Sequence, residues 1–117
     1  MLFDLDYPDK LAVQLRRLYP SLLPGNPDQD ALVPRVQEQL ERARAHGVEG
    51  DKDTFDYVAW GVSISARFDE HPLVRDSLRA YRPGAEGGLA KALEGVPDAV
   101  WNDMHAAQLA ALDGKDA

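Results

Sequence analysis

The sequence predicts an all-α fold, a compact bundle of about five helices with irregular, near-orthogonal packing. Three observations support this prediction. Apolar residues recur at helical spacing, Pro and Gly divide the periodic segments, and clean alternation rich in Val, Ile, Thr and aromatic residues is absent. The chain has 117 residues, of which 44% are hydrophobic, enough for a small core. We therefore expect a single helical domain over residues 1–117, with a frayed tail at 113–117.

The first predicted helix begins after Pro8, where Asp9 can cap the free amide groups. It is expected to end near Tyr19, because Pro20 and the Pro-rich segment over residues 24–27 interrupt it. Three leucines recur at i, i+4 and i+7 and predict its buried face: Leu11, Leu15 and Leu18.

The second predicted helix starts around Asp28 or Asp30 and runs to His46. Pro34 is placed in its first turn, where proline is tolerated. Gly47 stands where a left-handed residue ends a helix. Its predicted buried face is Leu32, Val36, Gln39, Leu40 and Ala43, and its polar face is mostly Glu38, Glu41, Arg42 and Arg44.

The third predicted helix opens at Asp51 or Asp53, two carboxylates that suit a helix N-terminus. It is apolar on two sides, which is typical of a central, buried helix. One stripe is Phe55, Val58, Ala59 and Val62, and the other is Tyr57, Trp60 and Ile64.

The remaining helices are shorter or follow a glycine-rich link. Pro72 in a first turn predicts a fourth helix that ends at Pro83-Gly84. A short helical piece over Leu89 to Leu93 and a last helix from about Pro97 to Leu112 follow the link. The apolar residues of the fourth helix are Leu73, Val74, Leu78 and Tyr81, and those of the last are Val100, Trp101, Met104, Ala107 and Ala111.

Charge and composition exclude several function classes. The chain carries 20 acidic and 13 basic residues, a formal net charge of −7, and no cysteine. It therefore lacks a thiol nucleophile and cysteine metal ligands, and its acid excess argues against nucleic acid as a partner.

The N-terminal segment has neither the basic nor the apolar region of a signal peptide, and no apolar run is long enough to cross a bilayer. We expect a cytoplasmic protein with no membrane partner.

Candidate catalytic and metal-binding residues are few. His46, His71 and His105 are isolated from one another, and no serine-nucleophile, phosphate-loop or EF-hand pattern is complete. Asp69-Glu70-His71 places three polar side chains in a row, but consecutive helical residues point about 100° apart and cannot converge on one ion. We expect no metal, no cofactor and no enzymatic activity.

The stretch from Leu40 to Leu78 resembles the C-terminal helical segment of adaptor proteins encoded beside type VI secretion spike proteins. In that family an Ala-x-x-x-Gly-like turn ends one helix, an acidic residue opens the next, and a Phe-Asp-x-x-Pro-like turn follows. The matching positions here are Ala43, Gly47, Asp53, Val58, Phe68 and Pro72. The resemblance implies a non-enzymatic bacterial accessory protein that binds a toxic effector or a spike component and helps to load it for export.

Three functional hypotheses follow. The first is this adaptor or chaperone role, and the second is an immunity protein whose negative charge steers it onto a basic toxin. The third is an enzyme that uses the Asp69-Glu70-His71 corner. The first two predict protein–protein interaction by a monomer or homodimer, and Trp101 is either core or a surface offered to the partner. The predicted partner-binding residues are Tyr57, Trp60, Arg67, Phe68, Asp69, Glu70, Tyr81 and Trp101.

Overall fold

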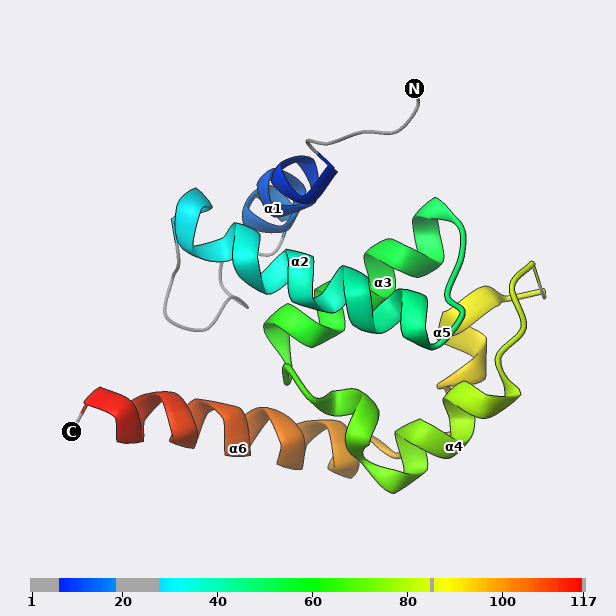
Figure 1. Ribbon diagram of the computed structural model, residues 1–117. Helices are drawn as coiled ribbons and strands as arrows, with labels where there is room; N and C mark the ends of the chain where they lie inside the picture. The colour runs from blue at the N-terminus through cyan, green and yellow to red at the C-terminus, as the bar shows by residue number, and fades with distance from the viewer. Residues whose placement is uncertain (1–6, 19–27, 85, 117) are drawn as a thin grey trace.

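Helices make up most of the chain that the structure describes. The structure is a computed structural model, and it describes residues 7–18, 28–84 and 86–116. Within these ranges it contains six α-helices, one 3₁₀ turn and no strand, which confirms the all-α prediction (Figure 1). The elements are α1 (Tyr7–Leu18), α2 (Gln29–Ala45), α3 (Asp51–Ser63), η2 (Phe68–Glu70), α4 (Pro72–Ala80), α5 (Gly88–Ala92) and α6 (Asp98–Asp116).

The other helices are arranged around α2 and α3. Helix α2 packs against α1 on one side and α3 on the other, and α3 also contacts α5. Helix α6 runs along one edge of the molecule and carries the C-terminus away from the other helices (Figure 1). It continues to Asp116, beyond the predicted end at Leu112. The predictions for residues 1–6 and for the Pro-rich connection over 19–27 lie outside the described residues.

The buried side chains form two clusters. The first, called here the N-terminal cluster, comprises Leu11, Ala12, Leu15, Leu32, Val36, Leu40, Val58 and Val62. The second, called the central cluster, comprises Ala43, Val48, Tyr57, Phe68, Val74, Leu78, Tyr81, Leu89, Leu93 and Val96. Both α2 and α3 supply residues to the two clusters. The two predicted apolar stripes of α3 are confirmed within the helix, because Val58 and Val62 enter one cluster while Tyr57 enters the other. Ile64, predicted in the second stripe, instead follows the last residue of α3 and is in neither cluster.

The ends of α2 follow from local sequence signals. The Asp28 carboxylate accepts a hydrogen bond from the Ala31 amide at 2.8 Å and caps the helix. At the other end Gly47 has φ 77°, and the Val48 amide donates to the Ala43 carbonyl at 3.0 Å. This is a Schellman motif, in which Val48 also packs with Ala43 in the central cluster. All five predicted core residues of α2 are buried.

Pro34 lies further into α2 than the sequence predicts. Because the helix begins at Gln29, Pro34 falls beyond the first turn. Proline has no backbone N–H, so the helical hydrogen bond from position 34 to the Asp30 carbonyl is missing. Asp30 and Pro34 are both exposed, so water can hydrate this carbonyl and the helix continues.

Two predicted core residues are instead on the surface. Leu18 at the end of α1 is 53% exposed and Leu73 in α4 is 46% exposed, whereas the other predicted apolar residues of these helices are buried. Pro72 occupies the first turn of α4 as predicted, but the helix ends at Ala80 and not at Pro83-Gly84. Tyr81 follows in extended conformation and returns its ring to the central cluster.

Helices α2 and α3 are in close contact at Gly61. Gln39, which is 1% exposed, lies against this glycine, and its Nε2 donates to the Ala66 carbonyl at 2.9 Å. A Cβ at position 61 would lie 2.6 Å from Gln39 Cγ, well inside van der Waals contact. Glycine at this position therefore leaves the space that the Gln39 side chain occupies.

Gly61→Ala is expected to lower the free energy of unfolding by about 2 kcal/mol because it overpacks the helix contact. Helix propensity alone would give the opposite sign, since Ala is favoured over Gly by up to about 1 kcal/mol. Urea denaturation of Gly61→Ala, Gln39→Ala and the double variant measures the coupling. The double variant should lose clearly less stability than the sum of the single losses. Additive losses would contradict the steric explanation.

Of the described helices, none has the length and apolar character needed to cross a membrane.

Candidate partner-binding site

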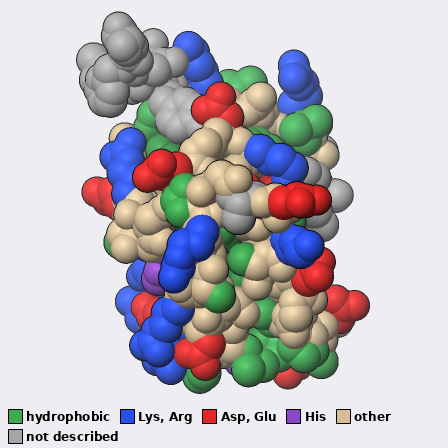
Figure 2. Space-filling view, turned by 90° about the vertical axis from the view of Figure 1, so that its right-hand side faces the viewer, with side chains coloured by type: hydrophobic (Ala, Val, Ile, Leu, Met, Phe, Trp, Pro, Cys, Tyr) green, Lys and Arg blue, Asp and Glu red, His purple; other side chains and the backbone are tan. Residues whose placement is uncertain are grey.

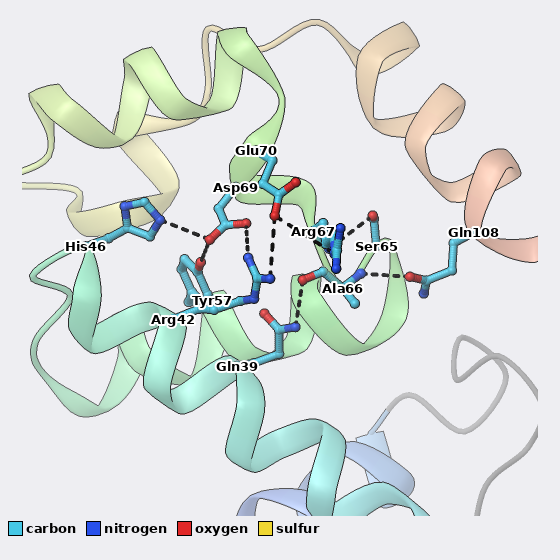
Figure 3. A network of polar contacts seen from close by, with 10 residues as sticks. All are labelled: Gln39, Arg42, His46, Tyr57, Ser65, Ala66, Arg67, Asp69, Glu70 and Gln108. Atoms are coloured by element: carbon cyan, nitrogen blue, oxygen red, sulfur yellow. Dashed lines mark hydrogen bonds and ion pairs between the residues drawn. The ribbon is translucent and has the colours of Figure 1, made fainter. Parts of the chain in front are cut away.

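A polar network joins η2 to the two central helices and is built around the buried Asp69 (Figure 3). Asp69 is 6% exposed, and its Oδ1 accepts from Arg42 Nη1 at 2.8 Å. Its Oδ2 accepts from the Tyr57 hydroxyl at 2.8 Å and lies 3.0 Å from His46 Nε2. Arg42 in α2, His46 directly after that helix and Tyr57 in α3 therefore offset the cost of burying one carboxylate. The network ties the turn η2 to both central helices.

The outer edge of this network is exposed. Arg42 Nη2 lies 3.6 Å from Glu70 Oε2, and Arg67 Nε lies 3.9 Å from the same oxygen. The side chains of Arg67 and Glu70 are 74% and 56% exposed, so this second pair contributes little to stability. Arg42, predicted on the polar face of its helix, is only 25% exposed because it turns inward to Asp69.

Burial and the hydrogen bond to Asp69 both raise the pKa of Tyr57 well above its ordinary value of 10.0. Burial and a hydrogen bond to Asp53 raise the pKa of Tyr81 in the same direction. An unfolded chain would release these protons near pH 10, whereas the folded chain retains them. Folding stability from this source is therefore intact below pH 10 and is lost as the pH rises above it.

We expect the free energy of unfolding to fall above pH 10 by about 1.4 kcal/mol per pH unit for Tyr57, and Tyr81 adds to the decline in the same direction. Urea denaturation on both sides of pH 10 measures this slope. Tyr57→Phe should start from a lower stability, because it loses the hydrogen bond to Asp69, but should show a shallower decline with pH. An unchanged slope in this variant would show that Tyr57 is not the group responsible.

The corner at residues 69–71 does not bring its three side chains together. Asp69 points inward to the network, and Glu70 points outward to Arg42 and Arg67. The His71 ring caps α4, where its Nδ1 accepts from the Leu73 amide at 3.1 Å. Over the described residues, no three His, Asp or Glu side chains gather to hold a metal ion.

Asp53 has a different partner from the one that the sequence suggests. It lies in the first turn of α3, but the N-cap of that helix is Gly50 and no side chain caps it. The Asp53 carboxylate instead accepts from the Leu89 amide at 3.0 Å and from the Tyr81 hydroxyl at 2.8 Å. It therefore caps α5 and fixes the segment after α4 against α3.

An aromatic cluster connects this interior to the surface. Phe68 is fully buried, with ring centroids 4.8 Å from Tyr57, 6.2 Å from Trp60 and 5.8 Å from Trp101. The two indole rings lie 5.8 Å apart at an angle of 42°. Both tryptophans are only partly buried and pack on the outside of the central cluster. They therefore have apolar surface available beside the core.

A groove of about 380 Å³ runs between α3 and α6 at these tryptophans. Its lining residues are Asp56, Ala59, Trp60, Ser63, Ile64, Trp101, Asn102 and His105. None of the α6 side chains described, at positions 98–110, is fully buried, and Val100, Trp101 and Met104 rest on the central cluster. Gln108 Oε1 also accepts from the Ala66 amide at 2.7 Å (Figure 3). Helix α6 is thus attached along one stripe, and the groove lies beside that attachment.

The predicted partner-binding residues fall into two groups. Tyr57, Phe68, Asp69 and Tyr81 are buried, so in this structure they support the fold and do not present a surface. Trp60, Arg67, Glu70 and Trp101 are partly or largely exposed. Of these, the structure brings Trp60 and Trp101 together in one groove.

Sequence reasoning missed the polar residues of the groove. Asp56 stands four residues before Trp60, and His105 stands four residues after Trp101. Helical spacing places each on the same face as its tryptophan, and this was the available signal. The pairing of the two helices could not be obtained from such local spacing.

Acidic and basic side chains are interspersed over the face that Figure 2 shows. Ion pairs of this kind occur on α4, where Asp76 lies 3.9 Å from Arg75 Nε and 3.7 Å from Arg79 Nη1. The acid excess of the chain is therefore not gathered into one patch on that face.

Comparison of the chain with protein-family models, with curated proteins and with solved structures finds no match.

Proposed function

We propose that this chain is a non-enzymatic protein-binding module whose contact surface is the groove between α3 and α6. The observation that supports this most is the position of Trp60 and Trp101, the two tryptophans of the chain, both partly exposed in that groove. Tryptophan is enriched among residues that dominate binding energy at protein interfaces. The buried Phe68 beneath them holds the surface in place, as a preformed contact site requires.

The finer role that we propose is that of a type VI secretion accessory protein, which binds an effector or a spike component. The resemblance over residues 40–78 is the basis for this role. The alternative is an immunity protein that neutralises a toxin by direct binding. The formal net charge of −7 favours this alternative for a basic toxin, because opposite charges speed association.

Affinity capture from a lysate of the source cells, with tagged protein and mass spectrometry, tests the proposal. Trp101→Ala removes an indole from the groove, and Asn102→Arg fills the groove from an exposed position without removing a core group. Both should lose one dominant partner that the unmodified chain retains. Leu73→Ala, which shortens an exposed apolar residue on α4, is the matched control and should keep it.

The outcomes separate the possibilities. Retention of the partner by both groove variants would exclude the groove as the contact surface, and no specific partner at physiological salt would overturn the protein-binding role. A captured spike or effector that stays active in the complex supports the adaptor role. A captured toxin that the chain inhibits supports the immunity role.

A further inference from the structure

The groove between α3 and α6 combines indole surface with one carboxylate. Among its described lining residues, Asp56 is the one acidic side chain, and no Lys or Arg lines the groove. Trp60 stands one helical turn after Asp56 on α3. Trp101 on α6 contacts the Trp60 ring. Indole faces attract cations through their π electrons. The groove therefore offers two kinds of group that favour positive charge.

The partner that Asp56 has in this structure is easily displaced. Its Oδ2 accepts from Lys52 Nζ at 2.7 Å, one turn earlier on α3. The Lys52 side chain is 77% exposed, whereas that of Asp56 is 22% exposed. A lysine on a flexible stem in open solvent gains little from such a pair and can turn away. Asp56 can then accept a cation that enters along the groove.

The geometry also limits the shape of the ligand group. The ring centroids of Trp60 and Trp101 are 5.8 Å apart, too close for a flat group to lie between them. A ligand must therefore lie against the outer faces of the indoles. The planar guanidinium of arginine stacks in this way and can still donate two hydrogen bonds to a carboxylate. The ammonium group of lysine is not planar, so it cannot stack flat on an indole while it donates two parallel hydrogen bonds to a carboxylate.

We infer that the groove binds an arginine side chain from a basic segment of the partner protein, stacked on Trp60 and Trp101 and paired with Asp56. This inference rests on the proposed function and identifies the chemistry of the same site. The net charge of −7 is complementary to such a segment and would attract it at a distance.

Selection of a random peptide library on the full chain, followed by synthesis of an enriched peptide, tests this inference. Both tryptophans line the groove, so indole fluorescence and the two indole N–H signals in NMR report on it directly. Enriched peptides should share an arginine. Replacement of that arginine by citrulline, which is neutral and of similar shape, should weaken binding about tenfold.

The effect should depend on Asp56. In Asp56→Asn the arginine peptide should keep only a preference of about two- to fourfold over the citrulline peptide, the part that the indole faces contribute. Asp76→Asn, which removes the same charge from an exposed position on α4, should preserve the difference.

Three results would overturn the inference. These are enriched peptides that bind the groove without arginine, equal binding of the citrulline form, and no peptide that shifts the two indole signals. The first leaves the groove as a protein contact site with an apolar anchor. Partner capture through Trp101 decides the proposed function separately.

Discussion

Phe68→Ala is expected to lower the free energy of unfolding by about 4 kcal/mol, the largest loss of any single truncation considered for this chain. Phe68 is fully buried, and its ring contacts Tyr57, Trp60 and Trp101. Truncation removes the apolar burial of the ring and leaves a cavity beneath the groove. The midpoint of urea denaturation, followed by circular dichroism, measures the loss.

Phe68→Leu serves as the control, because it keeps much of the volume and should cost less than half as much. The indole fluorescence of Phe68→Ala should also change in the folded state, since Trp60 and Trp101 both rest on this ring. A loss below about 2 kcal/mol would mean that neighbouring side chains collapse into the space.

Asp69→Ala is expected to cost about 3 kcal/mol. The substitution leaves the Tyr57 hydroxyl without its acceptor in the core and removes the ion-pair partner of the half-buried Arg42. A buried polar group that loses its hydrogen-bond partner has given up its hydration with no replacement, and this destabilises the folded state. Denaturation at neutral pH measures the effect.

Glu70→Ala is the neighbouring control, because Glu70 is 56% exposed and its ion pairs are longer. It should change stability by no more than about 0.5 kcal/mol. If the two variants lose the same amount, Asp69 does not organise the core in the way described.

Much of the fold could be predicted because its signals are local. The buried face of α2 from Leu32 to Ala43 follows from helical periodicity. The end of the same helix at Gly47 follows from the conformational freedom of glycine. The two apolar stripes of α3 could also be obtained from spacing alone, and they identified this helix as central.

The candidate site could be predicted only in part, because its contacts join distant residues. Asp69 resembles an exposed corner residue in the sequence, yet Arg42 and His46 reach it from 27 and 23 positions away. Asp53 resembles the cap of its own helix, yet it binds an amide 36 positions later. Helical spacing identifies the face on which a side chain lies, but not the element that covers it.

The sharing of α2 and α3 between the two clusters has a consequence for cooperativity. Loss of either helix would expose apolar surface in both clusters at once, so one cluster cannot melt while the other stays folded. We therefore expect the body of the molecule to unfold in a single two-state transition, as small domains commonly do. Helix α6, attached along one stripe, can open alone at a lower free energy. The groove would then disappear before the fold does, and binding would be the more sensitive measure of mild destabilisation.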